Sequence, residues 1–549
     1  MRRLFLAIAV LQFSAVEAQI PYTFLARAEE DTTLEGFQSN VIVEIRTQGD
    51  SSVWFGTGRG LTIMRDSVNV ISFPTAAAVS AGQTGKAIPE GGISAVAVAG
   101  SAWKNRNLQD DPIPNLSPTD TVLTAVAITI DDETAGGGLA LSVDAGEDVL
   151  PENISWYYFD QPKDSSGDST ITWGGVSLRA LPVTVLQNNV TYDIAIGERY
   201  YWIANWAGGL RRLNKSDITK GWKRVPLPED NQHEFLCGEQ MENYQLNPRD
   251  PPQGNHNHKV FSVIAYGDTI WAGTASGVNR GIMDDFGCID WKHYSFPLES
   301  MSGNWVVGMA KQEWDGQRTI WAVTRAADQA GEENGISYSH NDGETWHTAS
   351  LLQGEYGYNI FALDNLVYIA TRNGLWRTVD GQSFANYRPA IDKARSDQVI
   401  DNDVYAVVHD DREPYYEQEA LWVGTGDGMA RSRIPSSDSA IWRIFRSIES
   451  SDTPYAYPNP FSPTVYNRMD GDGYVRFHYS PKKSSLIRLT ILSFTMETVR
   501  TIDFTRGEGQ GALKWDGRDD DGNLVANGTY FCNLFYDDTS HWVKLVVVK

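Results

Sequence analysis

The chain has 549 residues and a formal net charge of −24, with 46 Lys and Arg against 70 Asp and Glu. Hydrophobic residues make up 41% of it and aromatic residues 11%, which can form large cores and excludes a wholly disordered chain. Because a phosphate backbone is bound by a basic surface, the acidic balance argues against a nucleic-acid-binding protein. Three cysteines are too few for a disulfide-rich scaffold. At about 100–200 residues per domain, the length predicts more than one domain.

Residues 1–18 have the pattern of a secretory signal peptide. Arg2 and Arg3 precede an apolar run at 4–10, and residues 16–18 place small side chains at a cleavage site before Gln19. A membrane anchor is the alternative, but a spanning helix needs about 20 apolar residues and polar residues interrupt this run. We therefore expect a mature chain that begins at Gln19, with no membrane span after cleavage.

One short motif recurs along most of the chain: aromatic, apolar, Gly or Ala, Thr, then a Gly turn into another strand. The copies are VWFGTGRGL from residue 53, YWIANWAGGL from 201, IWAGTASGV from 270, IWAVT from 320, VYIATRNGL from 367 and LWVGTGDGM from 421. The interval between the first two copies leaves room for a degenerate seventh copy. We place it near 93–98, 122–130 and 139–143.

This repeat predicts a β-propeller, in which blades of four short strands pack around an axis. The Gly after Thr supplies a tight turn with positive φ, and the large aromatic fills the space between neighbouring blades. A β-solenoid is the structural alternative, but its repeats are shorter. We therefore predict an all-β chain with a seven-bladed propeller over 19–445 and long insertions in blade 2 and at 229–259.

The segment SHNDGETW at 339–346 resembles the Asp-box, S-x-D-x-G-x-T-W, of sialidase-like propellers, with Asn341 in place of Asp. Weaker copies lie at 142–149 and 378–384. The six motif copies also resemble the extracellular propeller repeats of two-component regulators. The Asp-box resemblance implies a hairpin turn whose polar side chains bind backbone amides and a Trp that plugs the blade. It therefore gives Asp342 and Trp346 a structural role.

An extracellular sialidase-like or other glycoside hydrolase is the alternative function. Sialidases need three arginines, a Tyr nucleophile and acidic partners, and carry Arg-Ile-Pro near the first blade, whereas Arg433-Ile434-Pro435 lies in the last blade here. No pair of carboxylates stands out as a glycosidase pair. A sensor ectodomain is disfavoured because it would need a transmembrane segment and a kinase. We expect no catalytic residues, no cofactor and no metal site, and lean away from an enzyme.

Two smaller patterns stay open. His256 and His258 could present two imidazoles on one side of a strand, but the surrounding prolines favour an exposed loop. Cys237 and Cys288 flank the third motif copy and could form a disulfide after export, which would leave Cys532 unpaired.

The pattern changes after a linker at 446–456. Strand signals at 474–479, 485–492, 498–504, 512–515, 528–536 and 541–548 predict an immunoglobulin-like sandwich over 457–549. The opening YPNPF at 457, WDGRD at 515, GN at 522, NGTYF at 527 and the final KLVVVK match one module. It is similar to the immunoglobulin-like domain of the flagellar hook-capping protein and to C-terminal sorting domains of type IX secretion cargo. Met496 departs from that family, which often has Gly in this turn.

The resemblance implies a bacterial outer-membrane route, with the secretion machinery as a partner of this domain. An exposed C-terminal strand could add to a partner's sheet edge; the alternative is a spacer that does no sorting. Asp516, Asp519, Asp521 and Asn523 have a spacing like a calcium loop. However, no Glu follows at loop position 12, and hairpin turns favour these residues anyway.

These patterns together predict a secreted or cell-surface bacterial propeller that binds an unknown extracellular protein or glycan, with the periplasm as the alternative location. We expect the binding face at the loop-rich end of the propeller. The insertions at 75–92, 103–121 and 229–259 are the expected contributors.

Overall fold

The computed structural model describes residues 34–66, 69–99, 120–164, 170–179, 187–238, 255–327, 329–387, 391–392, 397–399, 401–412, 419–433, 442–449, 453–465, 467–469, 471–506 and 511–549. The predicted signal peptide, most of the insertion at 103–121, the middle of the insertion at 229–259, and Ile434 and Pro435 lie outside them. Within these ranges the chain is β-strand and turn. The helical exceptions are short 3-10 helices: η2 (Pro151–Asn153), η3 (Ile218–Lys220) and η4 (Ser350–Leu352).

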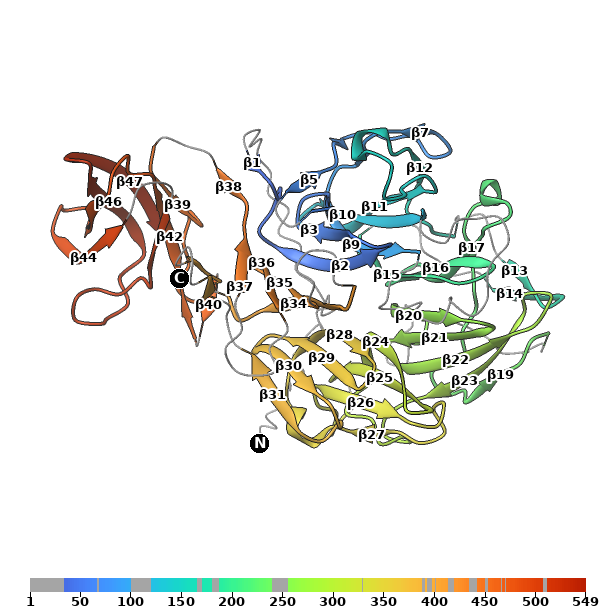
Figure 1. Cartoon of the computed structure of the whole chain (residues 1–549). Helices are drawn as coiled ribbons and strands as arrows, with labels where there is room; N and C mark the ends of the chain where they lie inside the picture. Colours follow the sequence, from blue (N-terminus) through green and yellow to red (C-terminus); the bar gives the residue numbers. More distant parts are fainter. Residues whose placement is uncertain are drawn as a thin grey trace, which may run out of the picture.

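Seven antiparallel sheets of the described residues surround one axis (Figure 1). Each innermost strand packs against the innermost strand of the next sheet, and the last packs against the first, which closes the ring. In order around the ring these strands are β2 (Ile42–Gln48), β9 (Gly92–Val98), β15 (Thr191–Ile196), β20 (Val260–Tyr266), β24 (Trp305–Trp314), β28 (Gly357–Leu363) and β34 (Val404–Asp410). The predicted seven-bladed β-propeller is therefore confirmed.

The remaining strands of each blade follow outward from the axis. Blade 1 continues with β3 (Ser52–Thr57), β4 (Leu61–Met64) and β5 (Val70–Ser72), and blade 2 with β10 (Val122–Ile130), β11 (Glu133–Ser142), β12 (Trp156–Phe159) and β7 (Thr84–Gly85). Blade 3 continues with β16 (Tyr200–Asn205), β17 (Gly209–Asn214) and β18 (Lys223–Arg224), and blade 4 with β21 (Thr269–Thr274), β22 (Gly277–Met283), β23 (Ile289–Tyr294) and β19 (Glu234–Phe235). Blade 5 continues with β25 (Gln317–Arg325), β26 (Gly335–Ser339) and β27 (His347–Thr348). Blade 6 continues with β29 (Leu366–Thr371), β30 (Gly374–Thr378) and β31 (Phe384–Tyr387). Blade 7 continues with β35 (Ala420–Thr425), β36 (Gly428–Arg433) and β37 (Trp442–Phe445). Short pairs between the blades are β6 (Thr75–Ala76) with β8 (Ile88–Pro89), β13 (Thr170–Trp173) with β14 (Val176–Arg179), and β32 (Ile391–Asp392) with β33 (Asp397–Gln398).

The recurring motif forms the second strand of a blade and the turn after it. The Thr57 hydroxyl donates to the Gly60 carbonyl (2.9 Å) and accepts from the Arg59 amide (3.1 Å), and Gly60 has φ +81°. Equivalent bonds and positive φ values occur at Thr274 with Gly277, Thr371 with Gly374, and Thr425 with Gly428. The predicted left-handed glycine turn is confirmed.

The small residue before Thr allows neighbouring blades to approach. A Cβ added at Gly56 would lie 2.8 Å from Ile93 Cγ2, and one added at Gly424 would lie 2.6 Å from the Ile42 carbonyl oxygen. Ile93 and Ile42 belong to the innermost strands of the following blades. A small residue is needed at Gly56 and Gly424 because these strands touch.

The motif aromatics fill the space between blades, as predicted. Trp422 of blade 7 contacts Phe55 of blade 1, with ring centroids 5.7 Å apart, and both side chains are fully buried. Trp271 of blade 4 contacts Trp346 of blade 5 at 6.5 Å. Large aromatic side chains of this kind contribute much of the buried apolar area between elements.

Blades 7 and 1 meet at the point where the ring closes, which we call the seam. Every blade consists mainly of strands that are consecutive in sequence, and in the described chain no sheet of a blade joins strands of blades 7 and 1. Beyond the blades, β1 (Leu34–Glu35) pairs with β38 (Ile448–Glu449). Asn40 binds Ser447 through its side chain, with its Oδ1 2.6 Å from the Ser447 amide, and its carbonyl accepts from the Gly428 amide (2.6 Å).

The C-terminal domain is a sandwich of two sheets beside blade 7 (Figure 1). One sheet contains β39 (Tyr455–Tyr457), β42 (Val475–Tyr479) and β45 (Gly511–Trp515); the other contains β44 (Thr498–Arg506), β43 (Ser485–Leu492), β46 (Gly528–Tyr536) and β47 (Thr539–Val547). A short hairpin pairs β40 (Arg468–Met469) with β41 (Asp472–Gly473). The predicted immunoglobulin-like sandwich is confirmed.

The YPNPF opening of this domain covers part of its last strand. The Asn459 side chain donates to the Lys544 carbonyl (2.8 Å) and accepts from the Val546 amide (3.0 Å). The Phe461 backbone exchanges hydrogen bonds with Val546 (2.7 Å) and Val548 (2.9 Å). The expectation of an exposed C-terminal strand is therefore wrong for the second half of β47, because its outer edge is already bonded.

Candidate functional site

The inner strands begin at one end of the propeller, which we call the entry end. The motif turns lie at this same end, because each turn amide reaches the chain that leads into the next inner strand. Gly60 donates to the Gly91 carbonyl (2.8 Å) and Gly277 donates to the Asn304 carbonyl (2.7 Å). The loops that connect one blade to the next therefore gather at the entry end.

All seven inner strands carry a β-bulge near their start, where the pairing with the second strand shifts by one residue. The extra residues are Val43, Ser94, Tyr192, Phe261, Val307, Tyr358 and Tyr405, which we call the bulge ring. A bulged residue is left out of the ladder, so its side chain is aimed independently of the strand. Those from blades 3 to 7 belong to one hydrophobic cluster, which is possible only near the axis.

The bulge ring is aromatic on the side of blades 3 and 4. Tyr192 contacts Phe261 with ring centroids 5.7 Å apart, and Trp206 and Trp305 contact the same Phe261 at 5.1 and 5.8 Å. The ammonium group of Lys259 lies 4.7 Å from the Trp206 ring centroid. This geometry is that of a cation–π contact.

On the side of blades 5 to 7, arginines stack on tyrosines. The Tyr356 ring has the guanidinium of Arg325 at 3.8 Å and that of Arg372 at 4.2 Å. Arg325 is fully buried and donates to the Gly357 carbonyl (2.7 Å), whereas Arg372 is exposed. Arg372 therefore presents a cation to solvent beside an aromatic surface.

Burial controls the protonation of the neighbouring groups. It raises the pKa values of Tyr358 and Tyr405, so both keep their protons at neutral pH. Burial also raises the pKa of Asp403, while Arg372 and Arg468 oppose this rise. The Tyr405 hydroxyl donates to Asp403 at 3.4 Å. This part of the entry end therefore combines aromatic side chains with the exposed guanidinium of Arg372.

The bulge ring was not among the sequence predictions. Its signal is an aromatic at the same point of four inner strands: Tyr192, Phe261, Tyr358 and Tyr405. Aligning the motif copies backwards from their Thr would have revealed this recurrence.

The insertions do not all lie at the entry end. The last residues of 75–92 and of 229–259 lead into β9 and β20 at the entry end. Cys237, by contrast, lies at the opposite end, because it is bonded to Cys288 in the turn between β22 and β23. Residues 103–121 lie between the end of β9 and the start of β10, which places the flanking residues Val98 and Val122 at the opposite end. Residues 103–119 lie outside the described residues, so the expected contribution of 103–121 to the binding face remains a prediction.

The exposed-loop interpretation of 256–258 is also wrong. Asn257 and His258 are buried, because the Asp230 carboxylate accepts from the Asn257 amide at 2.7 Å and folds the segment inward. The Asn257 side chain bonds Asn279 (2.8 Å) and Thr274 (2.7 Å). Burial lowers the pKa of His258 well below its ordinary value, which keeps the imidazole neutral.

The cysteines were left open by the sequence. Cys237 and Cys288 form a disulfide, which ties the first part of the 229–259 insertion to blade 4, and Cys532 is free and buried.

The Asp-box at 339–346 is a turn, as the resemblance implied. Asn341 Oδ1 accepts from the Thr345 amide (2.9 Å), and Ser339 Oγ accepts from the Gly343 amide (2.9 Å). Asp342 instead has φ +57° and lies 3.4 Å from Arg318. Trp346 is buried between blades 4 and 5. All of this lies at the end opposite the bulge ring.

The weaker copies form the same turn. Asp144 bonds Ser142 (2.8 Å), and Asp380 accepts from the Ser383 amide (2.7 Å). Hydrogen bonds from the amides of Ser383 and Gln382 lower the pKa of Asp380 to about 2.

The calcium-like spacing at 516–523 also forms a turn. Asp519 Oδ1 accepts from the amides of Asp521 (3.0 Å) and Asn523 (2.8 Å), and Asp516 accepts from the Arg518 amide (3.1 Å). Over the described ranges, no three His, Cys, Asp or Glu side chains gather as metal ligands would.

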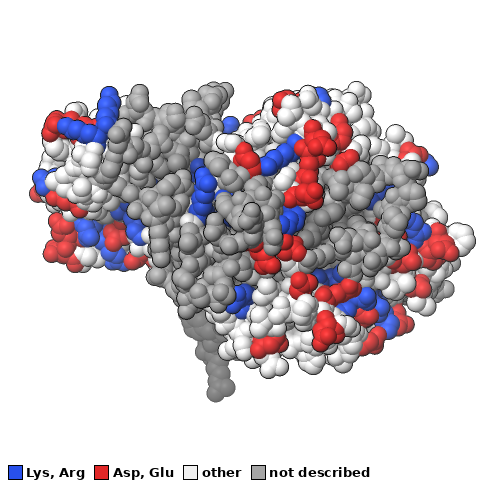
Figure 2. Space-filling model, viewed as in Figure 1, with Lys and Arg blue, Asp and Glu red and all other residues white. Residues whose placement is uncertain are grey.

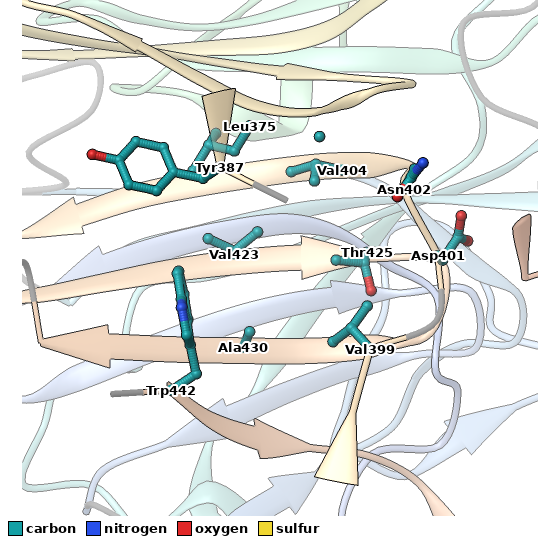
Figure 3. A pocket seen from close by; sticks show the side chains of 11 residues that line it. Leu375, Tyr387, Val399, Asp401, Asn402, Val404, Val423, Thr425, Ala430 and Trp442 are labelled. Carbon is teal, nitrogen blue, oxygen red and sulfur yellow. The ribbon is translucent and has the colours of Figure 1, made fainter. Parts of the chain in front are cut away.

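A cavity between blades 6 and 7 has a volume of ≈ 20 Å³ (Figure 3). Its lining is mainly apolar and includes Leu375, Tyr387, Val423 and Trp442. A volume of this size holds about one water molecule, so the cavity is not a ligand site.

Comparison with known proteins identifies the C-terminal domain. Residues 462–538 match the FlgD Ig-like domain family. This match agrees with the resemblance seen in the sequence. No curated protein is significantly similar to the chain. Among the residues that the structure places, no helix is long and apolar enough to cross a membrane.

Solved structures with remote similarity include three bacterial proteins. PorZ of Porphyromonas gingivalis, described as a surface component of the type IX secretion system, is 12% identical over 93% of this chain and 87% of its own, with a TM-score of 0.24. The GH74 enzyme of Niastella koreensis is 10% identical over 94% and 75%, with a TM-score of 0.43. The extracellular domain of BT4673 from B. thetaiotaomicron is 11% identical over 95% and 82%, with a TM-score of 0.18.

Proposed function

We propose that this protein is a secreted or cell-surface bacterial binding protein whose propeller recognises an extracellular protein or glycan at its entry end. The observation that carries the proposal is the stack of Arg325, Tyr356 and Arg372 beside the bulge ring. Aromatic faces and arginine are the groups that most often anchor interfaces. Figure 2 shows acidic and basic side chains of the described residues interspersed over the propeller surface.

A binding role fits the electrostatics better than catalysis. Near the bulge ring, the Asp401 carboxylate accepts from the backbone amide of Asp403 at 2.9 Å. Asp401 is only 8% exposed. A buried carboxylate of this kind supports the fold and cannot reach a glycosidic bond.

The location rests on the predicted signal peptide and the FlgD Ig-like match. Cell fractionation, with mass spectrometry of both termini, tests it. A surface or extracellular chain that begins at Gln19 supports the proposal. A chain found only in the periplasm would remove the surface location.

Binding can be tested with labelled protein on a glycan array and on outer-membrane vesicles of the source bacterium. We expect Arg372→Ala to weaken binding about tenfold or more, since truncation of an anchoring arginine costs at least about 1.4 kcal/mol. Arg199→Ala is the matched control, because Arg199 lies in the β15–β16 hairpin at the opposite end. Equal losses for both variants would remove the entry end from the proposal.

A further inference from the structure

The C-terminal domain docks on the propeller through a buried ion pair. Arg476 of β42 donates to the carboxylate of Asp427, and the side chains are 4% and 1% exposed. Arg446, which follows β37, lies 3.6 Å from the same carboxylate. Asp427 therefore joins two arginines, one at the start of the linker and one in the sandwich.

A second set of contacts surrounds this pair. The Gln398 carbonyl accepts from Arg476 and from Arg446 (2.7 Å), and the Gln398 side chain accepts from Lys514 at 3.0 Å. The Asn402 amide donates to the Arg468 carbonyl (2.9 Å). Three elements of the sandwich, β40, β42 and β45, thus hold the chain that leads into blade 7.

The docking site is continuous with the seam. Asp427 precedes Gly428, whose amide binds Asn40 at the start of blade 1, and Arg446 precedes Ser447, which binds the Asn40 side chain. Fixing Asp427 and Arg446 therefore fixes both groups that hold Asn40.

The seam is the joint of the ring that most needs such support. Every other pair of neighbouring blades is joined by the chain itself, so its two blades cannot drift apart. Blades 7 and 1 are held by non-covalent contacts, and regions held in this way open locally most easily.

We infer that the immunoglobulin-like domain is a clamp that keeps the propeller ring closed, and that it remains on the working protein. This role is separate from any role in export, and it goes beyond the proposed binding function. An ion pair that is buried between two domains favours one docked orientation, because in another docked orientation either charge would be buried without its partner.

The test uses the full mature chain with Arg476→Met. Arg488→Met is the matched control, because Arg488 forms an exposed pair with Asp503 (2.7 Å) on the other sheet of the same domain. Small-angle scattering reports whether the domains separate. Hydrogen exchange reports opening of the seam through the peptides 34–48 and 424–433, with 260–283 of blade 4 as the internal reference.

For Arg476→Met we expect domain separation and about tenfold or faster exchange in both seam peptides, with blade 4 unchanged. Lys514→Ala, a milder change at an exposed residue, should give the same pattern with a smaller increase. If blade 4 of Arg476→Met also loses protection, that variant has unfolded generally. The exchange of the seam peptides in Lys514→Ala then tests the clamp. If the domains of Arg476→Met separate without faster hydrogen exchange in the seam peptides, the clamp is wrong. It is also wrong if Arg476→Met gives the same scattering and the same exchange as Arg488→Met.

Discussion

Asp427 and Arg476 form a buried ion pair that joins the last blade of the propeller to the second strand of the sandwich. Asp427 occupies a motif turn that in other blades carries Arg59, Ser276 or Asn373 at the same position. The repeat therefore supplies the backbone for this contact, and one substitution within it provides the charge. Removing Asp427 leaves two buried arginines without their carboxylate, and removing Arg476 leaves Asp427 with Arg446 at 3.6 Å.

Asp401→Asn should stabilise the protein at high pH. Burial, with the nearby charges of Asp403 and Asp427, raises the pKa of Asp401 well above its ordinary value of 3.8, against the effect of Arg468. The folded state thus holds this proton more tightly than the unfolded state, and stability falls as pH rises above about 4. Asparagine retains the oxygen that accepts from Asp403. Urea unfolding at pH 8 should show a gain of about 1 kcal/mol or more that vanishes near pH 4.

Asp427→Asn is the matched variant, and we expect it to change the free energy of unfolding in the opposite direction. The same exchange of carboxylate for amide removes the ion pair to Arg476, so we expect a loss of about 3 kcal/mol at pH 7. If both variants shifted stability in the same direction, this account of the two aspartates would be wrong.

Gly273→Ala should destabilise the propeller. The added Cβ would lie 2.3 Å from Ser262 Oγ and 2.6 Å from Val306 Cγ1, where the inner strands of blades 4 and 5 meet. Overpacking of this kind costs about 1–3 kcal/mol. Gly308→Ala is the control, since its nearest neighbours lie at 3.6 Å. Thermal unfolding should separate the two variants, and equal melting temperatures would contradict the packing argument.

Reduction of the Cys237–Cys288 disulfide should lower stability by about 2–4 kcal/mol, because the bond closes a loop with a sequence separation of 51. The loss is measured by unfolding with and without reductant. Cys532 provides an internal control: burial raises the pKa of its thiol to about 12. In the reduced native protein a thiol reagent should label the half-buried Cys237 first and Cys288, which is 8% exposed, more slowly, whereas Cys532 should react only on unfolding. Rapid labelling of all three would contradict the burial of Cys532.

Met496→Gly should stabilise the sandwich. Met496 has φ +66°, a conformation that costs a residue with a Cβ about 1 kcal/mol and glycine almost nothing. The side chain is 55% exposed, so little packing is lost. Met496→Ala keeps the Cβ and should bring no gain in the unfolding transition of this domain. A gain for alanine equal to that for glycine would rule out strain as the cause.

Features set by local chemistry were predictable from the sequence. The turn at Thr57–Gly60 depends on four neighbouring residues, and the spacing of its copies gave the number of blades. The bulge ring was missed because a bulge changes pairing without interrupting the strand pattern around Tyr358 or Tyr405. The burial of His258 was missed because it depends on Asp230, which lies 27 residues before Asn257. The contact between Asp427 and Arg476 joins two domains, and no local pattern encodes it.

The seven bulges separate two roles that a strand residue usually combines. A residue within the ladder must suit its partners on both sides, whereas the extra residue of a bulge makes no such bond. Its side chain can therefore change without disturbing strand register. Six of the seven side chains are buried, so a substitution in the bulge ring would change the packing around the axis while leaving the pairing of every strand intact.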